Sequence, residues 1–162
     1  MATVILDTDF LSSFLKIERL GLIKAFFQVE SLHVPSAVYR EIAQTDLLPR
    51  LLAIKWIVVG QANKVAYEAL YHDEAFAALG EGEQESMLLA LDSTDAVLMM
   101  SDNQARRVAR THGIRVLSIP AFLLAGKMAG MIEREEMAQI IGDLKEKDYY
   151  KFKHEVREAL LK

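Results

Sequence analysis

The pattern of apolar and polar positions predicts an alternation of short strands and helices. Apolar runs at residues 2–6, 54–59, 96–100 and 115–117 predict buried strands, and the short apolar segment 31–34 is compatible with a further one. Apolar residues at helical spacing predict helices over residues 8–16, 20–27, 35–43, 62–71, 83–91, 103–112, 121–129, 133–145 and 149–161.

This order of elements predicts a fold of the α/β class. Strands that alternate with helices pair in parallel, so we expect a three-layer domain with a small parallel sheet of four or five strands flanked by helices. The 162 residues, 52% of them hydrophobic, are enough for one core. No repeat or long linker divides the chain. We therefore expect residues 1–130 to form the main domain and residues 131–162 to form a helical extension packed on it.

The composition limits the chemistry that the protein can perform. Cysteine is absent, which excludes disulfides, thiolate zinc sites and a thiol nucleophile, and the four histidines show no metal-binding spacing. Side-chain and backbone oxygens are therefore the metal ligands that this chain can offer. The apolar runs are too short to cross a membrane and the first residues do not resemble a signal peptide, so we expect a cytoplasmic protein. The net charge of −4 argues against a broad basic surface for nucleic acid.

Four acidic residues stand where a metal site would be built. Asp7 and Asp102 follow predicted strands, so both are expected at the carboxyl edge of the sheet, where ligands bind in open α/β folds. Glu41 and Glu85 lie in predicted helices that can carry carboxylates over the same edge. Hard divalent cations take oxygen ligands and retain water, so these acids predict a site for such a cation.

Each of these acids also has a simpler interpretation. Asp7 and Asp102 can cap the helices that follow them, a role that is compatible with metal binding. Glu41 can be an ordinary solvated side chain on an amphipathic helix. In the acidic run after Gly80, Glu83 is expected to stabilise the start of a helix through the helix dipole, whereas Glu85 lies deeper and is the better inward-facing ligand.

Polar residues beside these acids can assist them. Thr8 and Asp9 add oxygens next to Asp7, with Asp9 the weaker candidate, and Ser101 can hydrogen-bond a metal-bound water. Arg106 can either clamp a phosphate oxygen or pair with a nearby acid. The arginines after Asp102 are expected to form a basic rim that steers a phosphodiester, namely Arg106, Arg107, Arg110 and Arg115.

The aromatic residues near the carboxyl end have two interpretations. Tyr149, Tyr150 and Phe152 are expected either in the core or on an exposed surface that binds a partner.

Four segments together resemble the PIN domain superfamily of metal-dependent ribonucleases. They are VILDTDFLS at the first strand, VPSAVYREI around Glu41, GEGEQESMLLAL around Glu85, and MMSDNQARRVARTHGIRVLSI around Asp102. The likeness extends from about residue 2 to residue 130 and is to prokaryotic, toxin-like members. Glu85 stands where many PIN domains carry Asp.

The resemblance implies hydrolysis of single-stranded RNA at a site that holds Mg²⁺ or Mn²⁺. Asp7, Glu41, Glu85 and Asp102 would form the acidic quartet, with Asp7 and Asp102 as direct ligands. Glu41 and Glu85 would bind through water or orient the nucleophile. The resemblance also implies a homodimer and, for a toxin, a small antitoxin partner.

Two other functions are compatible with the sequence. A PIN-like protein can bind RNA or another protein with little cleavage. Alternatively, the apolar strand followed by Asp7 and Asp9 also looks like the nucleophile motif of haloacid-dehalogenase-type phosphatases, in which Asp7 itself would attack phosphorus. The phosphatase function leaves Glu41 and Glu85 without a role.

Overall fold

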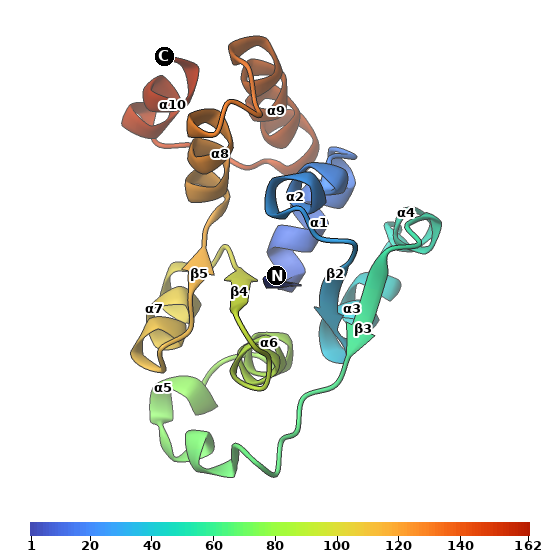
Figure 1. The fold of residues 1–162 in the computed structure, drawn as a ribbon, viewed down its shortest axis with the longest axis vertical. Coiled ribbons are helices and arrows are strands. Elements are labelled where there is room, and N and C mark those ends of the chain that lie inside the picture. The colour runs from blue at the N-terminus through green and yellow to red at the C-terminus, as the bar shows by residue number, and fades with distance from the viewer.

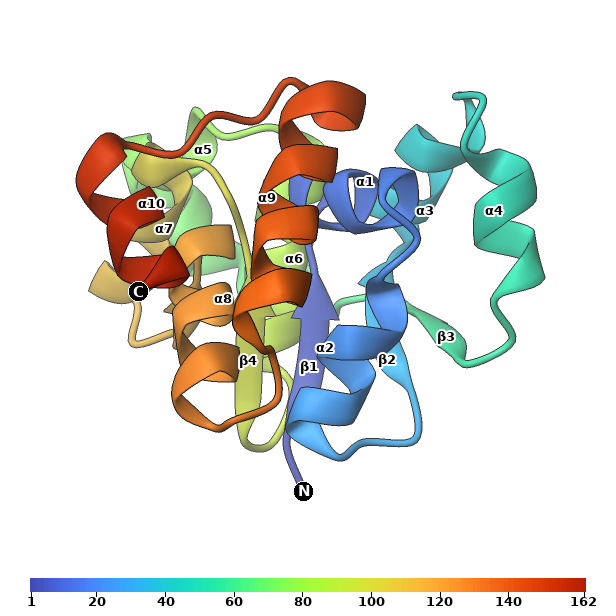
Figure 2. The same cartoon turned by 90° about the horizontal axis from the view of Figure 1, so that it is seen from above.

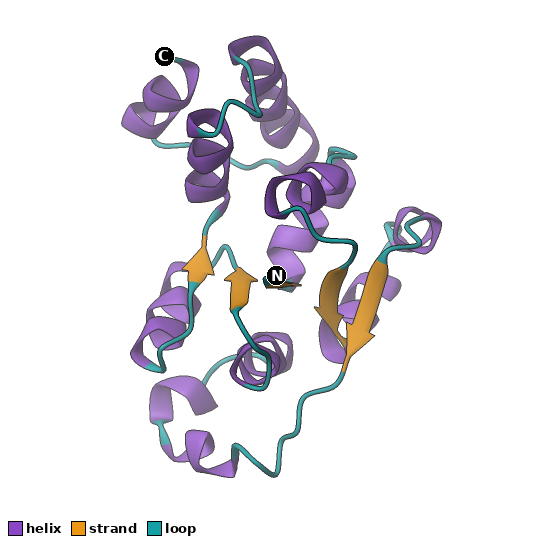
Figure 3. Cartoon of the chain, viewed as in Figure 1, coloured by secondary structure: helices purple, strands orange, loops and turns teal.

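The computed structural model describes all residues, 1–162, and its centre is a sheet of five parallel strands. The spatial order is β3-β2-β1-β4-β5, as Figures 1 and 3 show. The strands are β1 (Thr3–Leu6), β2 (Leu32–Pro35), β3 (Ile57–Gly60), β4 (Ala96–Met99) and β5 (Val116–Leu117). The predicted α/β class and the predicted parallel sheet are confirmed.

Helices make up most of the rest of the chain. They are α1 (Thr8–Lys16), α2 (Leu20–Phe27), α3 (Ser36–Ala43), α4 (Leu48–Ala53), α5 (Glu74–Ala77), α6 (Glu81–Leu91), α7 (Asn103–Thr111), α8 (Ile119–Met128), α9 (Arg134–Asp148) and α10 (His154–Leu161), with a short 3-10 helix, η1 (Glu68–His72). None of these helices has the length and apolar content needed to cross a membrane.

Side chains that alternate along β1 separate two cores on the two faces of the sheet. Val4 and Leu6 enter the larger core, whereas Ile5 enters the smaller one. The larger core lies under α1, α2, α8 and α9, and the smaller one lies between the sheet and α6 and α7 (Figure 1). Five phenylalanine rings meet in the larger core, with Phe122 in contact with each of the other four: Phe10, Phe14, Phe26 and Phe27.

The carboxyl-terminal extension covers the larger core. Buried side chains of α9, among them Ile140 and Leu144, belong to the same apolar cluster as α1 and β1. The carboxylate of Asp148 at the end of α9 accepts hydrogen bonds from Ser13 at 2.5 Å and from Lys16 at 2.8 Å. These bonds fix the carboxyl end of α9 against α1, so the segment that follows α9 starts from a defined position.

Several predicted elements differ in the structure. The prediction of a helix over residues 62–71 is wrong: the chain is irregular there and forms only η1. Tyr67 and Leu70 pack against the smaller core, but Val65 is 82% exposed, so the segment presents no continuous apolar face to that core. The strand predicted over 54–59 begins only at Ile57, and Pro49 lies in the first turn of the unpredicted helix α4. The helix predicted from residue 149 begins at His154 instead.

The strand order determines where a site can form. From β1 the chain moves outward on one side to β2 and β3, and then returns to place β4 on the other side of β1. The direction of winding therefore reverses between β1 and β4. In open α/β sheets, the crevice beyond the carboxyl ends of two such strands is where ligands bind.

Candidate functional site

Asp7 lies at this point of reversal, directly after β1. Because side chains alternate, Asp7 shares the face of Ile5 and points toward α6. It is only 4% exposed. The hydroxyl of Ser86 on α6 lies 3.2 Å from Oδ1 of Asp7 and 2.7 Å from the carbonyl oxygen of Gly82. The single proton of that hydroxyl serves one acceptor at a time, so Asp7 has little compensation for its lost water.

Burial raises the pKa of the Asp7 carboxyl from 3.8 to about 7. Removal from water is the largest cause, and the negative charges of Glu83 and Asp9 add to it. Hydrogen bonds from the backbone N–H of Thr8 and from Ser86 act in the opposite direction. Near neutral pH, Asp7 therefore exchanges a proton easily, and a nearby cation would displace that proton.

Glu41 reaches the same edge from α3. The hydroxyl of Thr8 donates to Oε2 of Glu41 at 2.9 Å, so the residue after Asp7 holds this carboxylate in place. Gly82 makes the approach of α6 possible, because a Cβ at that position would lie 2.8 Å from Oε1 of Glu41 and 3.3 Å from Oγ1 of Thr8. Pattern analysis did not single out Gly82; a glycine between two glutamates at a helix start was the available signal.

Glu85 is buried, 3% exposed, and points to the start of α3. Pro35 precedes that helix and has no side chain able to accept from its free N–H groups. Oε1 of Glu85 supplies the acceptor and takes hydrogen bonds from the backbone N–H of Ser36 at 3.0 Å and from its hydroxyl at 2.6 Å. Glu85 thus joins α6 to α3. Its role as a metal ligand stays a prediction.

Glu83 lies close enough to the other acids for their charges to interact. Its Oε1 accepts from the backbone N–H of Gly80 at 3.1 Å, which confirms the predicted role at the helix start. The pKa of Glu83 is raised, first by partial burial and then by the negative charges of Asp102, Asp9 and Glu41. Its own charge acts on Asp7 as well. The sequence interpretation missed this central position.

Asp102 and its neighbours close the site from the side of β4. Oδ1 of Asp102 accepts from the backbone N–H of Ala105 at 2.8 Å, so the predicted cap of α7 is confirmed. The Ser101 hydroxyl is buried and has no hydrogen-bond partner within the protein. Arg106 forms no salt bridge; it donates to the Ser101 carbonyl at 2.6 Å and to the Asn103 side chain, and so it supports the loop after β4.

The arginines after Asp102 do not all lie at this edge. Arg106 and Arg110 lie close enough for their charges to interact. Arg115 instead pairs with Asp95, and these two residues precede β5 and β4, at the amino edge of the sheet. The prediction of one basic rim that includes Arg115 is therefore wrong.

The acids share one edge but are separated in this structure. No group of three or more Asp, Glu or His side chains is close enough to hold a metal ion. Each carboxylate instead accepts from a hydroxyl or a backbone N–H: Asp7 from Ser86, Glu41 from Thr8, Glu83 from Gly80, Asp102 from Ala105. The all-oxygen donors, the readily lost proton of Asp7 and the unpartnered Ser101 hydroxyl suit a hard divalent cation in chemistry.

Comparison with known proteins identifies the family. A comparison with curated proteins gives no match. The model of a family described as "PIN domain" matches residues 3–162, which include all five strands, the acidic edge and the extension over α9 and α10. The chain therefore belongs to the PIN domain family.

Proposed function

We propose that this protein is a metal-dependent endoribonuclease that hydrolyses phosphodiester bonds in single-stranded RNA. PIN domains are generally nucleases and typically use divalent metals. The observation that carries the proposal is the position of Asp7, a buried carboxyl at the point where the strand order of the parallel sheet reverses. The charge of Glu83 acts on Asp7, and three further acids, Asp9, Glu41 and Asp102, act on Glu83. Burying an acid without a positive partner destabilises a fold, so a functional reason for keeping it is expected.

The proposed acidic set differs in one member from the quartet that the sequence suggested. We assign Asp7, Glu41, Glu83 and Asp102 to the site, because the charge of Glu83 interacts with each of the other three. Glu85 is a positioning residue, which acts through Ser36 to hold α3, and therefore Glu41, against α6.

These residues divide the work of hydrolysis. Asp7 and Asp102 would hold Mg²⁺ or Mn²⁺ from the ends of β1 and β4, and Glu41 and Glu83 would orient the attacking water. The bound ion supplies positive charge, which makes that water more acidic and stabilises the phosphate oxygens. A bond forms between the water oxygen and phosphorus, and the bond from phosphorus to the leaving ribose oxygen breaks. The attacking water gives up one proton to a neighbouring carboxylate or to solvent, and the leaving ribose oxygen takes up one proton. Thr8 fixes Glu41, and the Ser101 hydroxyl is free to donate to a water at the site.

A cleavage assay tests the proposal. Purified protein is incubated with labelled single-stranded RNA and Mn²⁺ or Mg²⁺, with chelator in parallel reactions. We expect cleavage with the metal and none with the chelator. RNA that is bound but left intact under every metal condition would contradict the nuclease and favour a binding module.

Replacing Gly82 with Ala is expected to slow cleavage by about ten- to a hundredfold, because a misplacement of about 1 Å at a catalytic group has effects of this size. The added methyl displaces Glu41, a flexible side chain, so the free energy of unfolding should change by less than about 1 kcal/mol. Gly21→Ala is the matched control, since a Cβ there meets nothing within 4 Å. Equal cleavage by both variants would show that Glu41 does not need its present position.

The toxin function, the antitoxin and the homodimer are further proposals. The edge strand β3 supports contact with an antitoxin or a second copy, because Val58 and Val59 are exposed on it and its outer backbone groups pair with no other strand. Light scattering that gives the mass of one chain would contradict the homodimer. Expression that leaves cell growth unchanged would contradict the toxin.

A further inference from the structure

A segment after α9 brings aromatic rings and positive charge close to the acidic edge. Residues 147–153, with the sequence KDYYKFK, comprise the last two residues of α9 and the connection to α10. In Figure 2 this connection crosses the molecule on the side toward which β1 points. Tyr150 and Arg106 lie close enough for the arginine charge to act on the phenol. Arg106 in turn supports the loop that carries Asp102, so the segment borders the proposed site.

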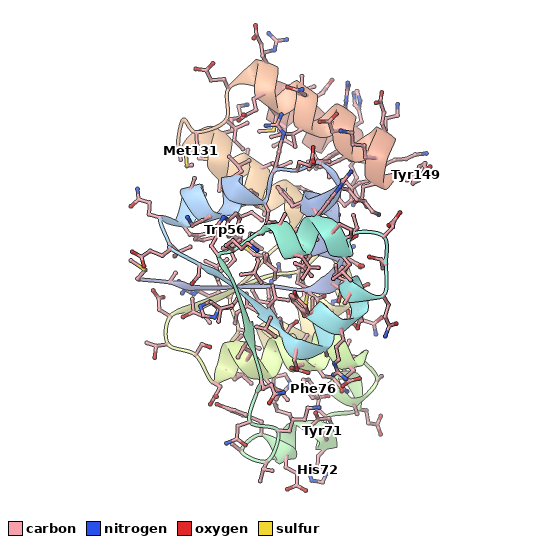
Figure 4. All side chains as sticks on the ribbon, turned by 90° about the vertical axis from the view of Figure 1, so that its right-hand side faces the viewer. Trp56, Tyr71, His72, Phe76, Met131 and Tyr149 are labelled. Carbon is pink, nitrogen blue, oxygen red and sulfur yellow. The ribbon has the colours of Figure 1, made fainter.

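Tyr149 projects from this segment into solvent. It is 84% exposed, and Figure 4 shows it pointing away from the end of α9. Its backbone is left-handed, with φ 54° and ψ 25°, a conformation that usually selects Gly or Asn at a helix end. Neither packing nor backbone preference explains a tyrosine here. A large ring held in water by a fixed backbone suits stacking on a planar ligand.

The rings that follow Tyr149 anchor the segment. Tyr150 and Phe152 meet edge to face with their centroids 5.0 Å apart, and both pack against the larger core. The backbone N–H of Tyr150 also donates to the carbonyl of Leu144 in α9 at 3.0 Å. The residues that follow Tyr149 are therefore fixed against the core and α9, which holds the backbone of Tyr149 in position.

Exposed lysines flank the aromatic rings. None of the salt bridges in the structure uses Lys145, Lys147, Lys151 or Lys153. Lys147 also lines a cleft of about 390 Å³ together with Lys16, Arg50 and one acid, Asp46. In a chain with a net charge of −4, this is a local concentration of positive charge beside an acidic edge. Phosphates along a strand would be attracted to these lysines.

We propose that residues 147–153 bind the single-stranded RNA that the site cleaves, with Tyr149 stacked on one base and Lys151 and Lys153 in contact with phosphates. The inference rests on the proposed ribonuclease function for the identity of the strand. Base stacking combined with backbone charge gives binding that tolerates many sequences, since every base has a flat face. Stacking requires an unpaired base, so the segment selects single strands over duplexes.

Variants of Tyr149 test the stacking. Binding of a short fluorescent single-stranded RNA is measured by anisotropy in chelator, where no cleavage occurs. Tyr149→Asn should bind about tenfold more weakly, and Tyr149→Phe within about twofold of the original protein, as expected for stacking on a ring. Asn suits the left-handed backbone, so the melting temperature of that variant should not fall. Duplex RNA should bind all three proteins equally.

The salt dependence of binding tests the lysines. Lys151→Gln combined with Lys153→Gln should reduce the slope of log K against log salt by about 1.4, since each phosphate contact to a single strand contributes about 0.7. Lys55→Gln combined with Lys64→Gln is the control with the same net charge, and its slope should be unchanged. Both control residues are exposed and lie outside the segment.

The outcomes separate this inference from the ribonuclease function. If Tyr149→Asn loses RNA binding but the original protein cleaves no RNA, the role of residues 147–153 in RNA binding is supported and the ribonuclease function is rejected. If the original protein cleaves RNA but Tyr149→Asn binds RNA as well as the original protein does, the ribonuclease function is supported and the role of residues 147–153 in RNA binding is overturned. An equal loss on duplex RNA, or no RNA binding by the original protein, would overturn it as well.

Discussion

Replacing Asp7 with Asn should reduce metal-dependent RNA cleavage by about a thousandfold or more, a size typical for the loss of a central catalytic group. Asn keeps the shape of the side chain but loses the negative charge that holds a cation. The backbone bond from the Asp7 N–H to the carbonyl of Met99, 3.0 Å long, does not involve the side chain. The variant should therefore fold, and its loss of activity would report on chemistry.

The same substitution should stabilise the metal-free protein above neutral pH. In the folded state Asp7 keeps its proton up to a pKa of about 7, whereas 3.8 is its ordinary value. Between these values the folded state binds more protons than the unfolded state, so the free energy of unfolding falls as pH rises across this window. Above pH 7 the full loss is on the order of 4 kcal/mol. Asn cannot ionise, so its variant avoids the loss.

Urea unfolding in chelator at pH 5 and pH 8 measures this effect. The original protein should be less stable at pH 8 than at pH 5, and Asp7→Asn should show a smaller difference. Asp92→Asn, at the opposite end of α6, is the control for both stability and cleavage. Full cleavage by Asp7→Asn would remove the main support for the proposed site, and an unchanged pH dependence would show that Asp7 is not the buried acid that titrates.

Replacing Glu83 and Glu85 separately with Ala should give opposite results. Glu83→Ala should lower cleavage by about a hundredfold and leave stability nearly unchanged, because the lost hydrogen bond from Gly80 is offset by the removal of one acid from a repelling group. Glu85→Ala should lower stability by about 1–3 kcal/mol, because the N–H and hydroxyl of Ser36 lose their acceptor. Cleavage by the folded Glu85→Ala protein should fall by less than about tenfold.

Glu81→Ala serves as the control on the same helix. Its carboxylate is exposed and pairs only with Arg40, so both cleavage and stability should stay near those of the original protein. Thermal unfolding and initial cleavage rates, each corrected for the folded fraction, measure the series. A large loss of cleavage in Glu85→Ala without loss of stability would restore Glu85 to the acidic set and displace Glu83.

The strands and most helices were predictable because their residues face a core. The bounds of α1 and α2 agree with the predicted ranges, since their buried residues recur at helical spacing. Residues 62–71 show the limit of this reasoning. Their apolar spacing is also helical, but Val65 and Ala66 are exposed, and only part of the segment, including Tyr67 and Leu70, packs against the smaller core, so an amphipathic helix gains little there.

The acidic residues of the proposed site that follow strands were predictable from the sequence, whereas those within helices were less so. Asp7 and Asp102 follow strands, so the parallel sheet alone brings them to one edge. The choice between Glu83 and Glu85 depends on the rotation of α6, and two residues along a helix correspond to a turn of about 200°. That rotation is set by the contacts of Gly82 and Ser86 with α3 and β1, which no local pattern contains.

The two hydrogen bonds from Ser36 to Glu85 couple the positions of α3 and α6. Because α6 supplies the acceptor that completes the start of α3, a shift of either helix disturbs the end of the other. A protein that bound beside the exposed Glu81 at the start of α6 and shifted this mostly buried helix would misalign Glu41 and Glu83 together. Control of the proposed ribonuclease would then not require a partner to cover the RNA-binding surface, and an inhibitor and the substrate would be able to bind at the same time.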